Sequence, residues 1–295
     1  MGRDSRLLLR TLAYYGSMGV DDIWLNVHAR PEWGNDFLQT VGRIADAHGA
    51  RIARVHAYPY IESNLTTRRV IEEQADPDDW ILYSDVDEFQ VYPNGPRHAL
   101  ELCRQHGCDF LWGTLIDRIS ADGRLHLLND RSLWNQFPLR AWVTGHVRRG
   151  DARKVVLARA DVVLGGGQHF AENGRGLPIE LCQAVVHHFR WDHDAVRSAR
   201  YLQGALEQYG AHWNAEYQRL LEYLDRNERR FDVSDAGLGC CVDPYVRDLQ
   251  SDAPAPAAAV AGATGSPPSD DQAQIELLRG LDIARNPDLY SDPDE

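Results

Sequence analysis

The sequence of 295 residues has almost no lysine, and Lys154 is its single example. Arginine therefore supplies nearly all the positive charge, and Lys+Arg (31) are outnumbered by Asp+Glu (44), for a net charge of -13. That balance argues against a nucleic-acid-binding surface. It also means that an anionic substrate could bind only where a metal ion or well-placed cationic side chains offset the negative charge locally. The lone lysine is either chance or a position that needs a compact ammonium group.

Long apolar runs and paired cysteines are scarce as well. No run approaches the roughly 18 residues of a membrane span. The first residues, MGRDSRLLLR, lack the apolar core and the cleavage site of a secretion signal. The five cysteines are odd in number and have no metal-finger spacing, which favours reduced thiols. We therefore expect a cytoplasmic protein without a membrane span.

The first 90 residues alternate helical and strand patterns. Apolar residues recur at helical spacing in RLLLRTLAYYGSMG, NDFLQTVGRIADAHG and LTTRRVIEEQA, and strand patterns occur in DDIWLNVHA, ARIARVHAY and DWILYS. The alternation favours βαβ units, and hence an α/β fold with a mostly parallel central sheet flanked by helices. In open parallel sheets, ligands bind beyond the carboxyl ends of the strands.

The rest of the chain changes character. Strand patterns continue in CDFLWGTLIDRI, KVVLARADVVLGGGQHF and AVVHHFRW, and residues 193–230 are amphipathic and helical. Residues 251–270 are rich in Ala, Pro, Gly and Ser and cannot bury enough apolar surface to become ordered. We expect one domain over residues 1–250 and a low-complexity tail over 251–295, in which QIELLRGLDIARN has the pattern of one short helix.

An acidic cluster, Asp85, Asp87 and Glu88, directly follows the apolar strand in ILYSDVDEFQ. In an extended chain, Asp85 and Asp87 would point to the same side, about 7 Å apart. Mg²⁺ and Mn²⁺ often bind through one or two carboxylates together with substrate phosphates. The cluster is therefore a candidate half of a metal site, and a solvated acidic turn is the plainer alternative. A calcium EF-hand loop is excluded, because Phe89 and Gln90 stand where it needs an oxygen ligand and a glycine.

Five blocks carry a resemblance to a known family: DWILYSDVDEF, GTLIDRISADGRL, SLWNQFPLR, RKVVLARADVVLGGGQHF and VVHHFRW. In this order they resemble bacterial family-2-like glycosyltransferases of the GT-A fold, over approximately residues 7–230. The resemblance implies a Rossmann-like sheet and a divalent metal, Mn²⁺ or Mg²⁺, held by Asp87 and Asp85. It also implies a nucleotide-diphosphate sugar donor, with Asp85 toward the ribose and sugar, and transfer to a hydroxyl acceptor with inversion. Such domains usually open with a strand, whereas this chain opens with a helix, so no base-binding residues are assigned.

Three histidines are candidates for completing the metal site. On a strand, His187 and His188 point to opposite faces, and His188 shares its face with Arg190. The more polar face suits a site beside a diphosphate, so His188 is the expected ligand. The family's pattern of a histidine before an aromatic residue points the same way. His169 and His187 remain alternatives as metal ligands or acceptor-binding residues, and Glu88 is a further one.

Asp117 and Arg118 end another apolar run. Asp117 is a candidate general base for the acceptor hydroxyl, and Arg118 is a candidate donor-binding residue that offsets phosphate charge. A plain Asp–Arg pair that stabilises the loop is the structural alternative. Lys154 is a further candidate cation for the diphosphate, although it is predicted at a strand start. The acceptor is expected to be a small soluble molecule or the soluble end of a glycan.

Two other classes of protein remain open. A haloacid-dehalogenase-like phosphatase would use Asp85 as nucleophile and Lys154 as its lysine, but Phe89 stands where a threonine or valine is expected. A non-catalytic sugar-binding module would keep the aromatic residues and would need no carboxylate pair. Only the transferase should bind a nucleoside diphosphate and manganese cooperatively.

Overall fold

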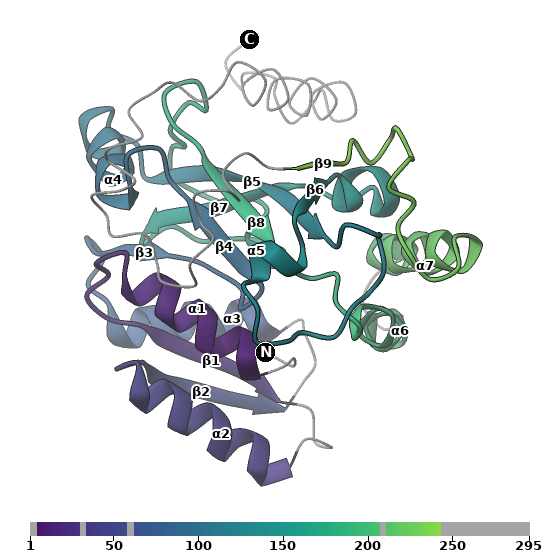
Figure 1. Cartoon of the computed structure of the whole chain (residues 1–295). Helices are drawn as coiled ribbons and strands as arrows, with labels where there is room; N and C mark the ends of the chain where they lie inside the picture. The colour runs from purple at the N-terminus through teal and green to yellow at the C-terminus, as the bar shows by residue number, and fades with distance from the viewer. Residues whose placement is uncertain (1–4, 30–33, 58–61, 207–210, 243–295) are drawn as a thin grey trace. The chain divides into compact units, whose positions relative to one another are not determined.

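The structure is a computed structural model that describes residues 5–29, 34–57, 62–206 and 211–242. The chain forms two compact units, Met1–Ala255 and Pro256–Glu295, and every described residue belongs to the first. The predicted tail at 251–295, with its short terminal helix, lies outside the described residues. The first unit is mixed α/β (Figure 1).

The amino-terminal part alternates helices and strands, as its sequence pattern predicted. Strands β1 and β2 lie side by side and parallel, with an irregularity in register between Leu25 and Asn26. A helix joins the two strands, so they form a βαβ unit. The elements of this part are α1 (Ser5–Gly16), β1 (Trp24–Ala29), α2 (Gly34–Ala47), β2 (Arg51–Ala57), α3 (Glu62–Gln74) and β3 (Trp80–Leu82).

Helices α1 and α2 each bury one apolar face against this parallel pair. Leu8 and Leu12 of α1, and Val41 and Ala45 of α2, belong with Val27 of β1 to one buried cluster. Residues four apart lie on the same face of a helix, so this spacing decides which face of each helix is buried. Full burial of one Leu or Val side chain stabilises the fold by about 1.5–3 kcal/mol.

A larger sheet of seven strands is built around β5. Strand β5 pairs antiparallel with β6 and β7, and parallel with β8. Strand β3 pairs with β7, β4 with β8 and β9 with β6, all antiparallel. The strands after β3 are β4 (Glu88–Val91), β5 (Phe110–Ile119), β6 (Leu139–Ala141), β7 (Arg153–Arg159), β8 (Ala184–His188) and β9 (Cys241–Val242).

The described strands do not form the mostly parallel sheet that the sequence pattern predicts. Among them, the β1–β2 and β5–β8 pairs are the parallel ones. Antiparallel neighbours need no helical crossover. After α4 (Pro96–Gln105), the strands up to β8 are joined by turns and short helical pieces: α5 (Leu133–Gln136), the π-helical turn η2 (Val143–Arg148) and the 3₁₀ turn η3 (Gly166–Gln168). The βαβ pattern therefore holds only at the beginning of the chain.

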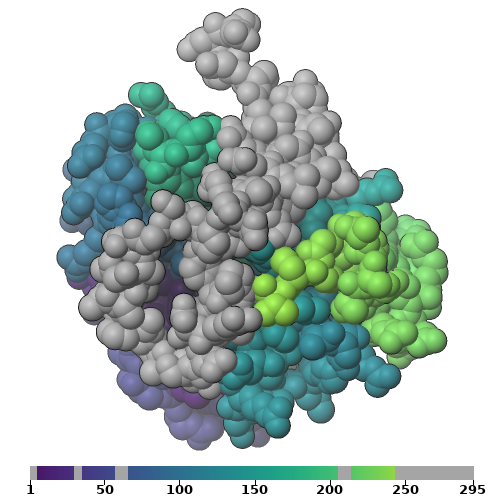
Figure 2. All heavy atoms as spheres, turned by 45° about the horizontal axis from the view of Figure 1, so that its top comes forward, coloured from purple at the N-terminus to yellow at the C-terminus, as the bar shows by residue number. Residues whose placement is uncertain are grey.

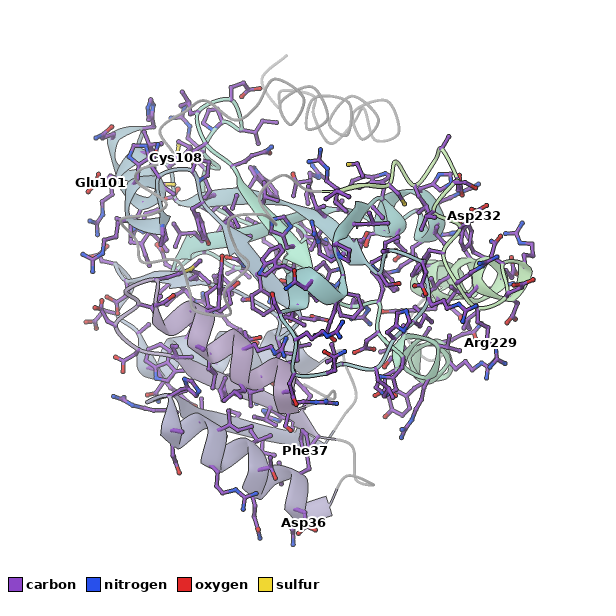
Figure 3. All side chains as sticks on the ribbon, viewed as in Figure 1. Asp36, Phe37, Glu101, Cys108, Arg229 and Asp232 are labelled. Atoms are coloured by element: carbon purple, nitrogen blue, oxygen red, sulfur yellow. The ribbon has the colours of Figure 1, made fainter. Side chains whose placement is uncertain are left out.

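The helical part expected over residues 193–230 forms two helices, α6 (Ala195–Leu206) and α7 (Ala211–Arg226). Their apolar residues share a buried cluster with Trp191 and Phe231. Helix α7 and the segment after it lie at the surface in Figure 2, and the exposed Arg229 and Asp232 project from that region in Figure 3. No helix within the described ranges is long and apolar enough to cross a membrane.

Replacing Gly113 by alanine should destabilise the chain by about 1–3 kcal/mol. Gly113 lies within β5, where an added Cβ would come within 2.6 Å of Val156 Cγ1 and 2.9 Å of Val186 Cγ2. A β-branched neighbour would then have to move in a packed core. Urea unfolding checks this beside Gly42→Ala in α2, where an added Cβ meets nothing within 4 Å. Equal losses in the two variants would contradict the close packing around β5.

Candidate functional site

The acidic cluster spans the turn between β3 and β4 and the first residue of β4. The backbone N–H of Glu88 donates to the carbonyl of Asp85 over 3.1 Å, so the segment is not extended. The expectation that Asp85 and Asp87 lie in an extended strand is therefore wrong, because both residues stand in the turn ahead of β4. Asp85 is exposed, whereas Asp87 (5% exposed) and Glu88 (2%) are buried.

Lys154 of β7 is the buried partner of this cluster. Its Nζ lies 2.5 Å from Glu88 Oε1 and 3.0 Å from Asp85 Oδ2, and the residue is only 3% exposed. Burial by itself would lower the pKa of Lys154, but the two carboxylates outweigh it and raise that pKa. The protein packed around Asp85 opposes its ionisation even though the side chain reaches solvent, yet the ammonium group outweighs this effect and lowers the pKa of Asp85. The single lysine thus holds two of the three clustered carboxylates.

Asp87 contacts residues at the end of strand β8 and just after it. Its Oδ2 lies 3.9 Å from His188 Nε2 and 3.7 Å from Arg190 Nη1. Strands β4 and β8 run side by side with Glu88 opposite His188, so the turn that carries Asp87 ends beside this histidine. The Asp87 carboxylate is thus placed beside a ring nitrogen and a guanidinium group.

Asp117 of β5 holds the other nitrogen of His188. Asp117 Oδ1 lies 3.0 Å from His188 Nδ1, and the β5–β8 register puts the two residues side by side. An ionised carboxylate accepts hydrogen bonds and cannot donate, so Nδ1 carries the proton. In a neutral imidazole, Nε2 then carries the lone pair, and it lies on the side of Asp87. A carboxylate behind a histidine is the arrangement that orients metal-binding imidazoles.

Asp117 is itself fully enclosed. Its carboxylate accepts hydrogen bonds from Trp191 Nε1 (2.7 Å), from the Thr144 backbone N–H (2.6 Å) and from Thr144 Oγ1 (3.0 Å). Its exposed fraction is 0%. These contacts favour a positioning role for Asp117 and leave no open side on which an acceptor hydroxyl could meet it as a base.

The other predicted residues lie elsewhere. Arg118 is fully buried, donates to the carbonyls of Phe137 (3.2 Å) and Pro138 (2.8 Å), and stacks over Trp134. Adjacent residues of a strand point to opposite faces, so Arg118 is turned away from the Asp117 side. Its contacts are those of a structural residue and not of a donor-binding one. His187 also packs against Trp134, with 4.7 Å between ring centroids.

His169 follows η3 and is held by the backbone. Its Nδ1 lies 2.7 Å from the carbonyl of Arg153, so this nitrogen donates. Burial, followed by the charge of Lys154, lowers the pKa of His169 to about 4. His169 is therefore neutral near pH 7 and lies within the electrostatic reach of Lys154.

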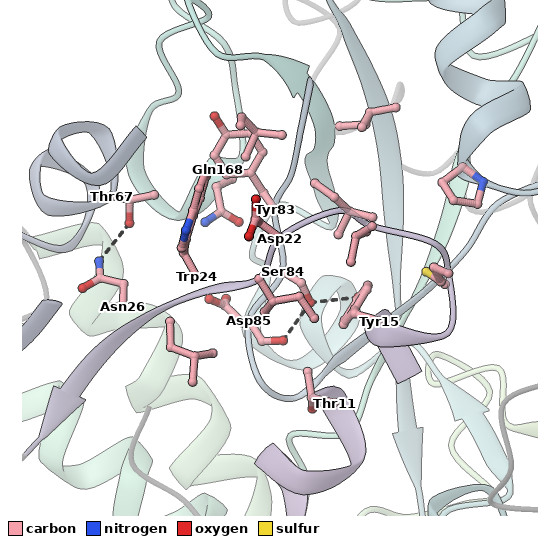
Figure 4. A pocket seen from close by; sticks show the side chains of 18 of the residues that line it. Thr11, Tyr15, Asp22, Trp24, Asn26, Thr67, Tyr83, Ser84, Asp85 and Gln168 are labelled. Atoms are coloured by element: carbon pink, nitrogen blue, oxygen red, sulfur yellow. Dashed lines mark hydrogen bonds between the residues drawn. The ribbon is translucent and has the colours of Figure 1, made fainter. Parts of the chain in front are cut away.

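A cleft of about 940 Å³ opens beside the acidic turn. Residues of α1, β1, α3 and β3 line it, together with Asp87. Figure 4 shows Asp85 at its wall. Tyr15 of α1 steadies the turn, because its hydroxyl donates to the carbonyl of Glu88 (2.9 Å) and accepts from Ser84 Oγ (2.8 Å). Gln168 of η3 and Arg190 also reach this cleft.

Sequence reasoning missed several of these residues. In the sequence, Arg190 only helped to decide whether His187 or His188 faces the site. In the structure it lies beside Asp87. Trp191, Thr144 and Tyr15 carry hydrogen bonds that position the site. Trp191 ends the block VVHHFRW, but no sequence pattern links any of the three to its bonding partner, which lies between 27 and 74 residues away.

Among the residues present, Asp87 and His188 are the pair that could hold a magnesium or manganese ion. Two ligands of one such ion, each about 2.1 Å from it, lie at most about 4.2 Å apart. The 3.9 Å between Asp87 Oδ2 and His188 Nε2 is below this limit and lies between the separations of adjacent (about 3.0 Å) and opposite (about 4.2 Å) ligands of an octahedron. Within the described part of the chain, no group of three or more His, Cys, Asp or Glu residues has the geometry of a metal site. The remaining ligands would therefore come from substrate phosphates and water.

No family model matches the chain. No curated protein matches it either.

Proposed function

We propose that the chain is a metal-dependent glycosyltransferase of the GT-A type, which transfers a sugar from a nucleotide-diphosphate sugar to a hydroxyl acceptor. The observation that carries this proposal is the arrangement of three side chains beside a cleft of about 940 Å³. Asp117 contacts one ring nitrogen of His188, and Asp87, which lines the cleft, lies beside the other. The buried Asp117 carboxylate orients His188. His188 and the Asp87 carboxylate are then close enough to bind the same ion. The five sequence blocks that resemble such enzymes support the same proposal.

In this proposal Asp87 and His188 hold Mn²⁺ or Mg²⁺. When bound, such an ion neutralises the charge that develops on a departing diphosphate. Arg190, 3.7 Å from Asp87 Oδ2, adds positive charge at the same place. Asp117 keeps His188 in the tautomer with a free Nε2. Asp85, the exposed carboxylate of the turn, is the residue that meets the donor, and transfer with inversion stays a prediction.

Calorimetry with a nucleoside diphosphate tests the proposal. UDP and GDP are each titrated with and without Mn²⁺, and Mn²⁺ should tighten the binding of one of them at least about tenfold, since the phosphates complete the ion's ligands. The effect should disappear in Asp87→Asn and persist in Glu222→Gln, an exposed carboxylate of α7. Binding that ignores Mn²⁺, or that survives in Asp87→Asn, rules the proposal out.

A phosphatase with an aspartyl nucleophile is the second candidate, because Lys154 Nζ lies 3.0 Å from Asp85 Oδ2. That enzyme would hydrolyse p-nitrophenyl phosphate in the presence of Mg²⁺ and lose the activity in Asp85→Asn. Hydrolysis without Mn²⁺-dependent binding of a nucleoside diphosphate would favour the phosphatase. The absence of both would leave the non-catalytic sugar-binding module.

A further inference from the structure

Two histidines lie side by side near the carboxyl ends of β1 and β2. His28 and His56 are partners in the register of these two parallel strands, which run next to each other in Figure 1. Residues that are paired in register on parallel strands project to the same face of the sheet. The two imidazole ring centroids are accordingly 5.7 Å apart, with an angle of 30° between the ring planes.

The separation of the two rings fits one metal ion bound by both. A zinc ion lies about 2.0–2.1 Å from an imidazole nitrogen, and this nitrogen is about 1.1 Å from the ring centroid, so each centroid would be about 3.2 Å from the ion. Two such rings have their centroids at most about 6.4 Å apart, and about 5.2 Å apart at a tetrahedral angle. The observed 5.7 Å lies between these values. The spacing of the two strands therefore brings both rings within reach of one ion.

The face of the sheet that carries this pair has enclosed polar atoms without a hydrogen-bond partner. His56 Nε2 is enclosed by protein and has no such partner among the described residues. The same holds for Oδ1 of Asn26, which precedes His28 by two residues and therefore projects from the same face. The amide nitrogen of Asn26 is satisfied, because it donates to Thr67 Oγ1 over 3.1 Å (Figure 4). Nearly all buried polar atoms in proteins have a partner, so an enclosed ring nitrogen without one points to a ligand.

The electrostatic surroundings of the pair favour a cation. Burial lowers the pKa of His28 to about 4, and the neighbouring His56 adds to this shift. A neutral imidazole can bind a metal without first losing a proton. Asp85 opposes the shift, so its negative charge acts on His28 and would also attract a bound cation. Because His28 lines the cleft, an ion can reach it from solvent.

We propose that His28 and His56 together bind one divalent transition-metal ion of the class that prefers imidazole, with Zn²⁺ as its representative. Imidazole nitrogens suit Zn²⁺, Cu²⁺ and Ni²⁺, whereas carboxylate and phosphate oxygens suit Mg²⁺ and Mn²⁺. Two protein ligands leave the other positions of the ion to water, so the ion is exchangeable. It connects the carboxyl ends of β1 and β2 at a place separate from Asp87 and His188. The inference does not rest on the proposed function.

Hydrogen exchange of the full chain, followed at residues 26–29 and 54–57 during a Zn²⁺ titration, tests the site. Saturating Zn²⁺ should slow exchange there at least about tenfold, because an ion bound by both strands opposes their local separation. Mg²⁺ at the same concentration should have no such effect. His28→Ala and His56→Ala should each raise the Zn²⁺ concentration needed for protection at least about tenfold, since each removes one of two ligands. His28→Cys should retain the protection, because a thiolate is also a zinc ligand.

His106→Ala is the matched control, because it removes an exposed histidine that follows α4. Zn²⁺ protection should be unchanged in this variant. Two results overturn the inference. Exchange at residues 26–29 and 54–57 that ignores Zn²⁺ would mean that the two rings are packing partners only. Protection at the same Zn²⁺ concentration in His28→Ala or His56→Ala would mean that the ion binds elsewhere. The protection should persist in Asp87→Asn, which removes the proposed Mg²⁺ or Mn²⁺ ligand, so the outcome is independent of the glycosyltransferase proposal.

Discussion

Replacing Lys154 by methionine should destabilise the chain by about 3–5 kcal/mol, because it leaves a buried carboxylate without its partner. The pair is Lys154 Nζ and Glu88 Oε1, 2.5 Å apart, and the two side chains are 4% and 2% exposed. Asp85 contributes less to this loss, since its side chain is 55% exposed and solvent screens the pair. Urea unfolding at pH 7 measures the change.

A second substitution shows that the loss comes from the unpaired charge. In the Lys154→Met background, Glu88→Gln removes the buried charge and should recover a large part of the stability. The control Arg43→Met removes an exposed cation from α2 and should change stability by less than about 0.5 kcal/mol. If Lys154→Met and Arg43→Met behave alike, the lysine is not what holds the acidic turn.

Replacing His188 by alanine should weaken Mn²⁺-dependent binding of a nucleoside diphosphate by at least about 10- to 100-fold, the range typical of losing even an indirect metal contact. The reason is geometric: His188 Nε2 faces Asp87 Oδ2, and Nδ1 is held by Asp117. Calorimetry with UDP or GDP and Mn²⁺ measures the effect.

His187 provides the matched control for that experiment. It is the same residue type, one position away, on the face that packs against Trp134. His187→Ala should leave Mn²⁺ affinity unchanged and lower the melting temperature through lost packing. Loss of the metal effect in His187→Ala, with none in His188→Ala, would show that the wrong histidine is assigned. No loss in either variant would leave His169 as the remaining histidine candidate.

The early part of the fold was accessible from sequence because its signals are local. The apolar residues of α1 and α2 recur at helical spacing, and Gly49 follows the end of α2. Both signals depend only on residues that are neighbours in the sequence. The amphipathic pattern of residues 193–230 predicted α6 and α7 for the same reason. Strand direction after β3 is not a local property, because each strand pairs with one far away in the chain. The sheet was therefore expected to be mostly parallel, and its described strands are mostly antiparallel.

The same distinction between local sequence signals and long-range contacts applies to the candidate site. By itself the sequence determined that a carboxylate cluster follows a strand, that one lysine stands among many arginines, and that His187 and His188 face opposite sides of a strand. Only the tertiary structure decided what each side chain meets. Lys154 reaches Glu88 across 66 residues of chain, and Asp117 reaches His188 across 71. Arg118 turns to loop carbonyls although it neighbours Asp117. Alternation along a strand fixes the side on which a residue projects, but pairing between distant strands fixes its partner.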